Sequence, residues 1–366
     1  MLAKFSVKNF KCFKERLDFD FTNIKDYSFN EEVIKNNTVN KAIVYGINAS
    51  GKSNLGFAIF DIIIHATDKE KIYSYYNHYF NAENDIKTAE FSYMFKFDKD
   101  IVEYEYKKED YQVPFYEKLK INGKIVVECN RKINSEVTIN LEEAKTLKTN
   151  IENDKLSVIK YIKNNANYEK ESVIGKFFSF LDRMLWFRSV KDNSYLGFTN
   201  GKSNLSDIIL ENNLVKDFEN FLNEMGIKCK LGETESSNKK VLAFDFGKEK
   251  IPYYEIVSNG TADLCLFYCW MQNFKNISFL FIDEFDAHYH QDLAEKIVER
   301  LKKFTETQTV LTTHCSGLMN NHLLRPDCYF ELEDGKILPL FKKTNKELRE
   351  AHNLEKIYRA GGFKNG

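Results

Sequence analysis

Residues 46–53, Gly-Ile-Asn-Ala-Ser-Gly-Lys-Ser, have the residue types and the spacing of a loop that binds phosphate. The two glycines let the backbone turn its N–H groups towards one point, and the start of a following helix adds a partial positive charge there. Lys52 offers a cation to the β- and γ-phosphates, and Ser53 offers a hydroxyl oxygen to Mg²⁺. The pattern predicts a site for ATP and Mg²⁺, with Gly46, Asn48, Ser50, Gly51, Lys52 and Ser53 as its residues.

The segments on either side of this loop fit the same interpretation. An apolar run, Ala42–Tyr45, precedes the loop, and apolar residues recur at helical spacing over residues 55–63. A strand, a loop and a helix in this order are the context that a phosphate-binding loop requires.

Two carboxylates end a second apolar run, Phe279–Ile282. In open α/β sheets, ligands bind at the carboxyl ends of the strands. We therefore expect Asp283 to hold Mg²⁺, and Glu284 to orient or deprotonate the attacking water. Alone, the pattern also fits an ordinary strand that meets an acidic turn, and it is the phosphate loop that favours the catalytic interpretation.

A second segment with the pattern of a buried strand, Thr309–Thr313, ends in a hydroxyl and is followed by His314. The spacing leaves room for one helix, near residues 293–304, between two adjacent parallel strands. His314 is then a candidate to hydrogen-bond the γ-phosphate or the attacking water. The alternative is a histidine that caps a turn.

Ser258 and Gly260 precede an apolar helical pattern. A serine and a glycine before a helix can bind phosphate through N–H groups and a hydroxyl, although alone they are also an ordinary helix N-cap. Their position one helix ahead of the acidic strand makes them candidates for the nucleotide site.

The remaining patterns predict the elements that position these residues. Residues 2–8, 17–21 and 91–127 alternate in the manner of an antiparallel sheet, with a hairpin turn at Asn122-Gly123. Residues 141–226 are mostly helical in pattern, and the last third alternates helix and strand. We expect an α/β fold in three parts: 1–140 with the phosphate loop and an antiparallel lobe, 141–226 as a helical insertion, and 227–366 with the acidic strand.

The composition argues against a strongly basic nucleic-acid-binding protein, a disulfide-bonded protein and a membrane protein. The 366 residues include 53 Lys and Arg against 54 Asp and Glu, so no overall positive field attracts nucleic acid, although a local basic patch is not excluded. Seven scattered cysteines without a CxxC pair fit reduced thiols in a cytoplasmic protein. The chain shows no signal layout and no long apolar segment, so we expect no membrane association.

The ordered set of motifs resembles ABC-type ATPases of the SMC and RecF class. Within that class the chain is similar to the ATP-binding proteins of bacterial phage-defence and abortive-infection systems. Residues 7–13, 282–286 with His290, 324–327 and 353–358 carry this closer match, which spans nearly the whole chain.

The resemblance implies an ABC-type ATPase head that forms a head-to-tail dimer with two nucleotides between the copies. Ser258 and Gly260 would contact the γ-phosphate bound by the other copy, Asp286 would lie in the loop that links the two sites, and His314 would be the switch residue. Asn9 and Lys11 would reach the phosphates. The implied function is a nucleotide-dependent switch, the regulatory subunit of an anti-phage system that controls a separate effector such as a nuclease or a toxin.

Three features depart from the family pattern: no Gln lies between Ser53 and Gln112, Gln291 replaces a common Pro, and Thr261 replaces a second Gly. Two alternatives remain, a RecF- or SMC-like DNA-repair ATPase, with DNA as partner, and a slow ATPase scaffold that sequesters a toxin. A second Gly-Lys-Ser, in residues 197–203, lacks a preceding apolar strand and is interpreted as a loop.

Overall fold

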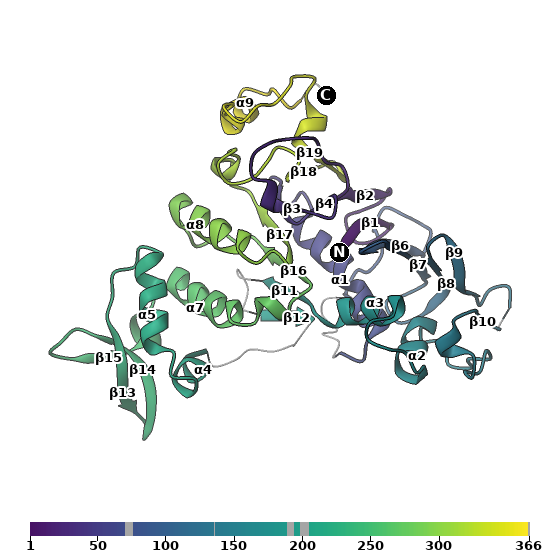
Figure 1. Cartoon of the computed structure of the whole chain (residues 1–366), viewed down its shortest axis with the longest axis horizontal. Helices are drawn as coiled ribbons and strands as arrows, with labels where there is room; N and C mark the ends of the chain where they lie inside the picture. The colour runs from purple at the N-terminus through teal and green to yellow at the C-terminus, as the bar shows by residue number, and fades with distance from the viewer. Residues whose placement is uncertain (70–75, 135, 189–193, 198–204, 365–366) are drawn as a thin grey trace.

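The computed structural model describes residues 1–69, 76–134, 136–188, 194–197 and 205–364. The Gly-Lys-Ser of residues 201–203 lies outside this part of the chain. Two seven-stranded sheets carry most of the core, and a small three-stranded sheet projects beyond α5 (Figure 1).

The core sheet has the strand order β12-β11-β16-β17-β5-β18-β19. Its five inner strands run parallel, and β12 and β19 pair antiparallel at the two edges. The inner strands β5, β16 and β17 are buried along their whole length, which explains why β5 and β16 carry the apolar runs Ala42–Tyr45 and Phe279–Ile282 instead of an alternating pattern. The strands are β5 (Lys41–Tyr45), β11 (Met184–Arg188), β12 (Ser194–Gly197), β16 (Phe279–Asp283), β17 (Gln308–Thr313), β18 (Tyr329–Glu333) and β19 (Lys336–Pro339).

The antiparallel lobe is a second sheet with the strand order β10-β9-β8-β7-β6-β1-β2. It confirms the antiparallel sheet that the alternating sequence pattern predicts. The turn between β8 and β9 consists of Asn122 and Gly123, with φ values of 52° and 78°, as a two-residue hairpin requires. The strands are β1 (Leu2–Lys8), β2 (Leu17–Asp20), β6 (Ala89–Phe97), β7 (Asp100–Lys108), β8 (Pro114–Ile121), β9 (Lys124–Asn130) and β10 (Thr138–Ile139).

Helices cover both faces of the core sheet. Helix α1 lies on one face, between the core sheet and the antiparallel lobe, whereas α7 and α8 cover the other face (Figure 1). The helices are α1 (Lys52–Ala66), α2 (Val158–Asn165), α3 (Val173–Asp182), α4 (Leu205–Glu211), α5 (Val215–Glu224), α6 (Tyr253–Ile256), α7 (Asn259–Met271), α8 (Gln291–Lys302) and α9 (Leu354–Arg359). Two small sheets complete the fold, β3 (Ile34–Lys35) with β4 (Thr38–Val39), and β13 (Leu231–Ser236), β14 (Lys239–Asp245) and β15 (Lys250–Pro252).

The expected helical insertion at 141–226 needs one correction. It contains α2 to α5, but between α3 and α4 it also supplies β11 and β12 to the core sheet, where β11 pairs in parallel with β16. The apolar run Met184–Phe187 is buried on both faces, and so short a run does not distinguish a strand from a buried helix by its periodicity.

A buried polar cluster fastens α1 to the antiparallel lobe. Asp61 of α1 accepts hydrogen bonds from Lys108 at 2.5 Å, from Tyr106 at 2.8 Å and from Tyr79 at 2.8 Å. Asp61 and Lys108 are both about 1% exposed, so each charge depends on the other for stabilisation. This cluster holds the helix that begins at the phosphate loop in a fixed orientation.

Within the described residues, no helix is both long enough and apolar enough to cross a membrane.

Candidate nucleotide site

The phosphate loop connects β5 to α1 and has the backbone that the sequence predicts. Ala49 and Gly51 have φ values of 64° and 102°, in the left-handed region. A Cβ atom at Gly51 would lie 2.7 Å from Sγ of Cys12, and one at Gly46 would lie 2.4 Å from Oγ of Ser50. Both glycines are therefore needed for close packing, and Gly51 also for its φ value.

Lys52 is folded back onto this loop. Its Nζ donates hydrogen bonds to the carbonyl oxygens of Gly46 at 2.7 Å and Ile47 at 3.0 Å, and the residue is 4% exposed. Burial lowers the pKa of Lys52, whereas three nearby carboxylates act in the opposite direction. These carboxylates belong to Glu284, Asp283 and Asp286, so the structure brings the predicted cation and the predicted acids together.

Asp283 lies on the α1 face of the core sheet. Residues of β16 alternate between the two faces, and Phe281 meets α1 at Gly56, whereas Ile282 faces α7 and α8. Asp283 therefore points to the same side as Phe281. Its buried Oδ1 accepts a hydrogen bond from Oγ1 of Thr312, on the adjacent strand β17, at 2.7 Å.

Glu284 begins the loop after β16 in an unusual conformation. Its φ is 46°, in the left-handed region, which costs a non-glycine residue roughly 1–3 kcal/mol. Its backbone N–H donates to Oγ1 of Thr312 at 2.8 Å, and the N–H of Phe285 donates to the carbonyl of Thr312 at 3.1 Å. Thr312 thus fixes Asp283 and Glu284 together, with the chain turning sharply between them.

Asp286 is held in the same way by the next residue of β17. Its Oδ2 accepts a hydrogen bond from Oγ1 of Thr313 at 2.7 Å, while its buried Oδ1 has no hydrogen-bond partner within the described part of the chain. Burial raises the pKa of Asp286, and the Thr313 hydroxyl, His314 and Lys52 oppose the shift. His314 itself is exposed at the end of β17, close enough to affect this carboxylate.

The predicted signature residues lie apart from the phosphate loop. Ser258 is the exposed N-cap of α7, where its Oγ accepts from the N–H of Thr261 at 3.3 Å. Gly260 packs so tightly that a Cβ there would lie 2.7 Å from the carbonyl oxygen of His288. Because α7 and α1 cover opposite faces of the sheet, one copy of the chain does not join Ser258 to Lys52 (Figure 1).

The two N-terminal candidates differ in their surroundings. Asn9 is 2% exposed, and its amide nitrogen donates to the carbonyls of Ile86 at 2.5 Å and Thr88 at 2.9 Å, so this amide has a structural role. Lys11 lies beside the first turns of α1, with Nζ 4.8 Å from the ring centroid of Phe57. Of the two, only Lys11 is placed near the helix that follows the phosphate loop.

The C-terminal helix reaches the start of the phosphate loop. The rings of Tyr358 and Tyr45 pack edge to face with centroids 4.8 Å apart, and the Tyr358 hydroxyl donates to Glu331 at 2.6 Å. Tyr45 directly precedes Gly46, so the far end of the chain supports the strand that presents the loop.

Residues 41–320 match the family described as "AAA domain, putative AbiEii toxin, Type IV TA system". The chain belongs to this AAA domain family. The match extends from β5 to just beyond the end of β17, and therefore includes every predicted site residue except Asn9 and Lys11.

Among solved structures, this AAA domain is similar to heads of SMC proteins. It shares 15% identity with the SMC head domain from Thermotoga maritima, over 92% of this chain and 98% of that chain, with a TM-score of 0.47. A second match is an SmcHead bound to the C-winged helix domain of ScpA, with 17% identity, coverage of 92% and 96%, and a TM-score of 0.46. A search of curated proteins finds no match.

Two residues of the AAA domain site were not among the sequence-predicted ones. Thr312 and Thr313 hold Asp283 and Asp286, respectively, through their hydroxyls. The available signal was the Thr-Thr pair at the end of a strand expected beside the acidic strand, but only the strand register shows which carboxylate each hydroxyl meets.

Proposed function

We propose that this AAA domain binds ATP with Mg²⁺ and hydrolyses it to ADP and phosphate. The observation that carries the proposal is the convergence of Lys52 and Asp283 on the α1 face of the core sheet, beyond the carboxyl ends of β5 and β16, two parallel strands that flank β17. In the proposed complex, backbone N–H groups of residues 46–51 cradle the phosphates. Lys52 exchanges the carbonyls of Gly46 and Ile47 for the β- and γ-phosphates.

The residues present fit a magnesium ion. The Ser53 hydroxyl and the Asp283 carboxylate supply hard oxygen ligands, and Mg²⁺ usually takes one or two protein ligands together with phosphate oxygens and water. Among the described residues no group of three or more His, Cys, Asp or Glu side chains is arranged to hold a metal ion, so a cage built wholly from such side chains is not what this site offers. When bound, the ion neutralises charge on the phosphates.

Glu284 is the proposed general base. Its strained backbone and the hydrogen bond from its N–H to Thr312 fix the start of its side chain beside the magnesium ligand Asp283. The carboxylate then orients and deprotonates the water that attacks the γ-phosphate. His314 follows β17, the strand between β16 and β5, and its proposed role is to contact the same phosphate.

The site is proposed to be completed by a second copy of the chain. Ser258 is exposed at the N-terminus of α7, and a helix N-terminus with a serine hydroxyl is a good ligand for a phosphate. In a head-to-tail dimer Ser258 and Gly260 would contact the γ-phosphate held by the phosphate loop of the other copy.

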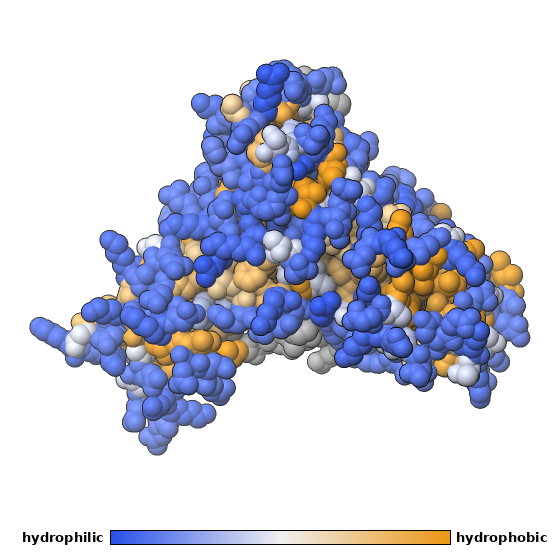
Figure 2. Space-filling model, viewed as in Figure 1, coloured by the Kyte–Doolittle hydropathy of each residue, from blue (hydrophilic) through white to orange (hydrophobic). Residues whose placement is uncertain are grey.

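Exposed apolar side chains flank both halves of this composite site. Ile47, within the phosphate loop, is 67% exposed, and Tyr254 and Ile256, just before Ser258, are 50% and 47% exposed. The space-filling view shows hydrophobic surface near α4 and β14, the strand that α6 with Tyr254 and Ile256 packs against (Figure 2). A head-to-tail dimer would cover Ile47 of one copy and Ile256 of the other, which would favour association.

The proposed biological role is that of a regulatory switch in anti-phage defence that controls a separate effector. The family description, with its AbiEii toxin and type IV toxin–antitoxin system, supports this setting. In this role ATP binding closes the dimer and hydrolysis opens it, so that the effector responds to two states of different contacts.

The purified chain tests the enzymatic part of the proposal. We expect phosphate release from ATP that requires Mg²⁺ and is lost in Lys52→Ala. Phosphate release that survives this substitution would place the chemistry elsewhere. In cells, protection against phage should be lost with Glu284→Gln, whereas sensitivity to DNA damage without any effect on phage would favour the DNA-repair alternative.

A further inference from the structure

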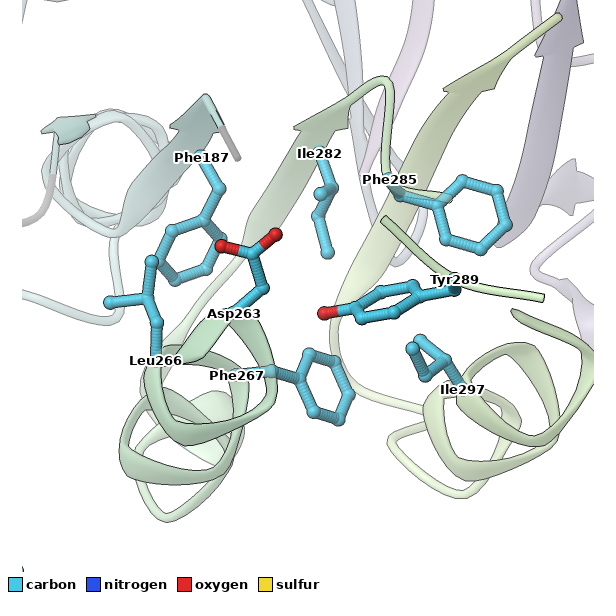
Figure 3. Close-up of a pocket in the computed structure, with 8 residues that line it drawn as sticks. All are labelled: Phe187, Asp263, Leu266, Phe267, Ile282, Phe285, Tyr289 and Ile297. Carbon is cyan, nitrogen blue, oxygen red and sulfur yellow. The ribbon is translucent and has the colours of Figure 1, made fainter. Parts of the chain in front are cut away.

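The loop that carries Glu284 and Asp286 packs against apolar side chains of α7 and α8. Phe285 and Tyr289 of this loop line a pocket beneath the tip of β16, and Tyr289 reaches across the pocket towards Asp263 (Figure 3). Among the pocket-lining residues that the structure describes, Asp263 is the one with a charged side chain. The others are Phe187, Leu266, Phe267, Ile282, Phe285, Tyr289 and Ile297.

Asp263 lies in the second turn of α7 and is paired with a histidine of the loop. Its Oδ2 lies 2.6 Å from Nδ1 of His288, and the two side chains are 8% and 31% exposed. Burial raises the pKa of Asp263, and the hydrogen bond to His288 opposes this shift. A short hydrogen bond to a carboxylate in apolar surroundings is strong and directional, so it fixes the position of His288 relative to α7.

The same histidine contacts the signature segment through its backbone. The carbonyl oxygen of His288 lies against Gly260, where even a methyl group would come within 2.7 Å. Residue 288 is therefore joined to α7 at two points, the backbone of Gly260 and the carboxylate of Asp263.

The other end of the loop is joined to β17, beside the phosphate loop. Thr312 binds the backbone of Glu284, and Thr313 binds the Asp286 carboxylate. The loop thus connects the signature segment on one face of the sheet to the proposed general base at its carboxyl edge. A shift of α7 can reach Glu284 through this short and doubly anchored segment.

We propose that Asp263 and His288 are a positioning pair that transmits engagement of Ser258 and Gly260 by the other copy's nucleotide to Glu284 of the same chain. The proposal rests on the proposed function, because it assumes ATP hydrolysis in a head-to-tail dimer. Neither residue contacts the nucleotide, and the pair acts through the loop of residues 284–290.

The test compares hydrolysis with nucleotide affinity in the full-length chain. We expect His288→Ala to lower kcat roughly tenfold, while the affinity for a fluorescent ATP analogue stays within about twofold, because the residues around Lys52 are unchanged. His288→Asn, whose amide can replace the Nδ1–H donor, should recover most of the rate. His322→Ala, at an exposed histidine elsewhere on the surface, is the matched control and should behave as wild type.

Two results would overturn the inference. One is wild-type kcat in His288→Ala, and if the melting temperature falls at the same time the pair only stabilises the fold. The other is a loss of kcat and affinity together that His288→Asn does not recover. If the wild-type chain itself fails to hydrolyse ATP, the proposed function has failed instead, and the two failures are distinguishable.

Discussion

Nζ of Lys52 lies 2.7 Å from the carbonyl oxygen of Gly46. The lysine of the proposed phosphate loop is therefore hydrogen-bonded to the backbone of that loop. A carbonyl is a neutral acceptor, whereas a phosphate is charged, and the hydrogen bond from Lys52 strengthens when phosphate replaces the carbonyl. The arrangement holds Lys52 close to the position that the β- and γ-phosphates would occupy.

This relationship predicts that Lys52 serves binding more than stability. Lys52→Met should reduce ATP affinity at least a hundredfold, while the melting temperature stays equal or rises, because the substitution removes a cation whose burial is unfavourable. Calorimetric titration with ATP and thermal unfolding measure the two quantities. A large loss of thermal stability would instead make Lys52 a structural residue.

The Thr312 hydroxyl is predicted to be required for hydrolysis. It bridges the Asp283 carboxylate and the N–H of Glu284, so Thr312→Val should lower kcat by about 10- to 100-fold, in line with other residues that orient metal ligands. Thr309→Val is the matched control on the same strand, because that buried hydroxyl bonds only a backbone carbonyl in the described structure, that of Thr307. Equal rates in the two variants would contradict the bridging role.

Much of this site was predictable because its parts are local in sequence. The residue types and spacing of residues 46–53, and of the carboxylates at the end of β16, are enough to predict a nucleotide site. The α/β fold follows from apolar runs that alternate with helical patterns. The partners of the carboxylates were not predictable. Thr312 meets Asp283 only because β17 pairs with β16 in one register, and a shift by one residue would turn its hydroxyl to the other face.

Two further features that the sequence did not predict have a similar origin. Strand β11 lies within the segment expected to be helical, because a run as short as Met184–Phe187 fits either structure until its neighbour β16 is known. The Asp263–His288 pair joins segments that are distant in sequence, and nothing local in either segment indicates the other.

Lys41, at the start of β5, is predicted to make stability depend on pH. Burial lowers its pKa from 10.5 to about 7, while its Nζ donates to the carbonyls of Phe304 at 2.9 Å and Thr307 at 2.5 Å. The folded pKa lies below the unfolded one, so the unfolded chain binds the proton more tightly. The free energy of unfolding should therefore rise with pH from about 7 to about 10, by at most about 1.4 kcal/mol per pH unit.

Urea unfolding of wild type and Lys41→Met at several pH values isolates this contribution. The difference between the two, wild type minus variant, should increase as the pH rises above about 7 and should be constant below that pH. A difference that stays flat up to about pH 9.5 would show that Lys41 remains charged in the folded chain.

The exposed apolar residues beside the signature are predicted to lie in the dimer interface. Ile256→Asp should leave ATP affinity unchanged but weaken ATP-dependent association at least tenfold, because it places a charge in a contact that would otherwise bury an apolar side chain. Ile133→Asp, at a residue 83% exposed in the loop after β9, is the control and should associate as before. Equal association by both variants would exclude Ile256 from the interface.

The most direct test of the central claim is the mass of Glu284→Gln with and without ATP. This substitution removes the proposed base and keeps the binding residues, so ATP should persist and hold two copies together. Light scattering is expected to report a monomer without nucleotide and twice that mass with ATP and Mg²⁺, with no change when Lys52→Ala is added. A mass that does not change on addition of ATP, in a variant shown to bind it, would contradict a site completed by two copies.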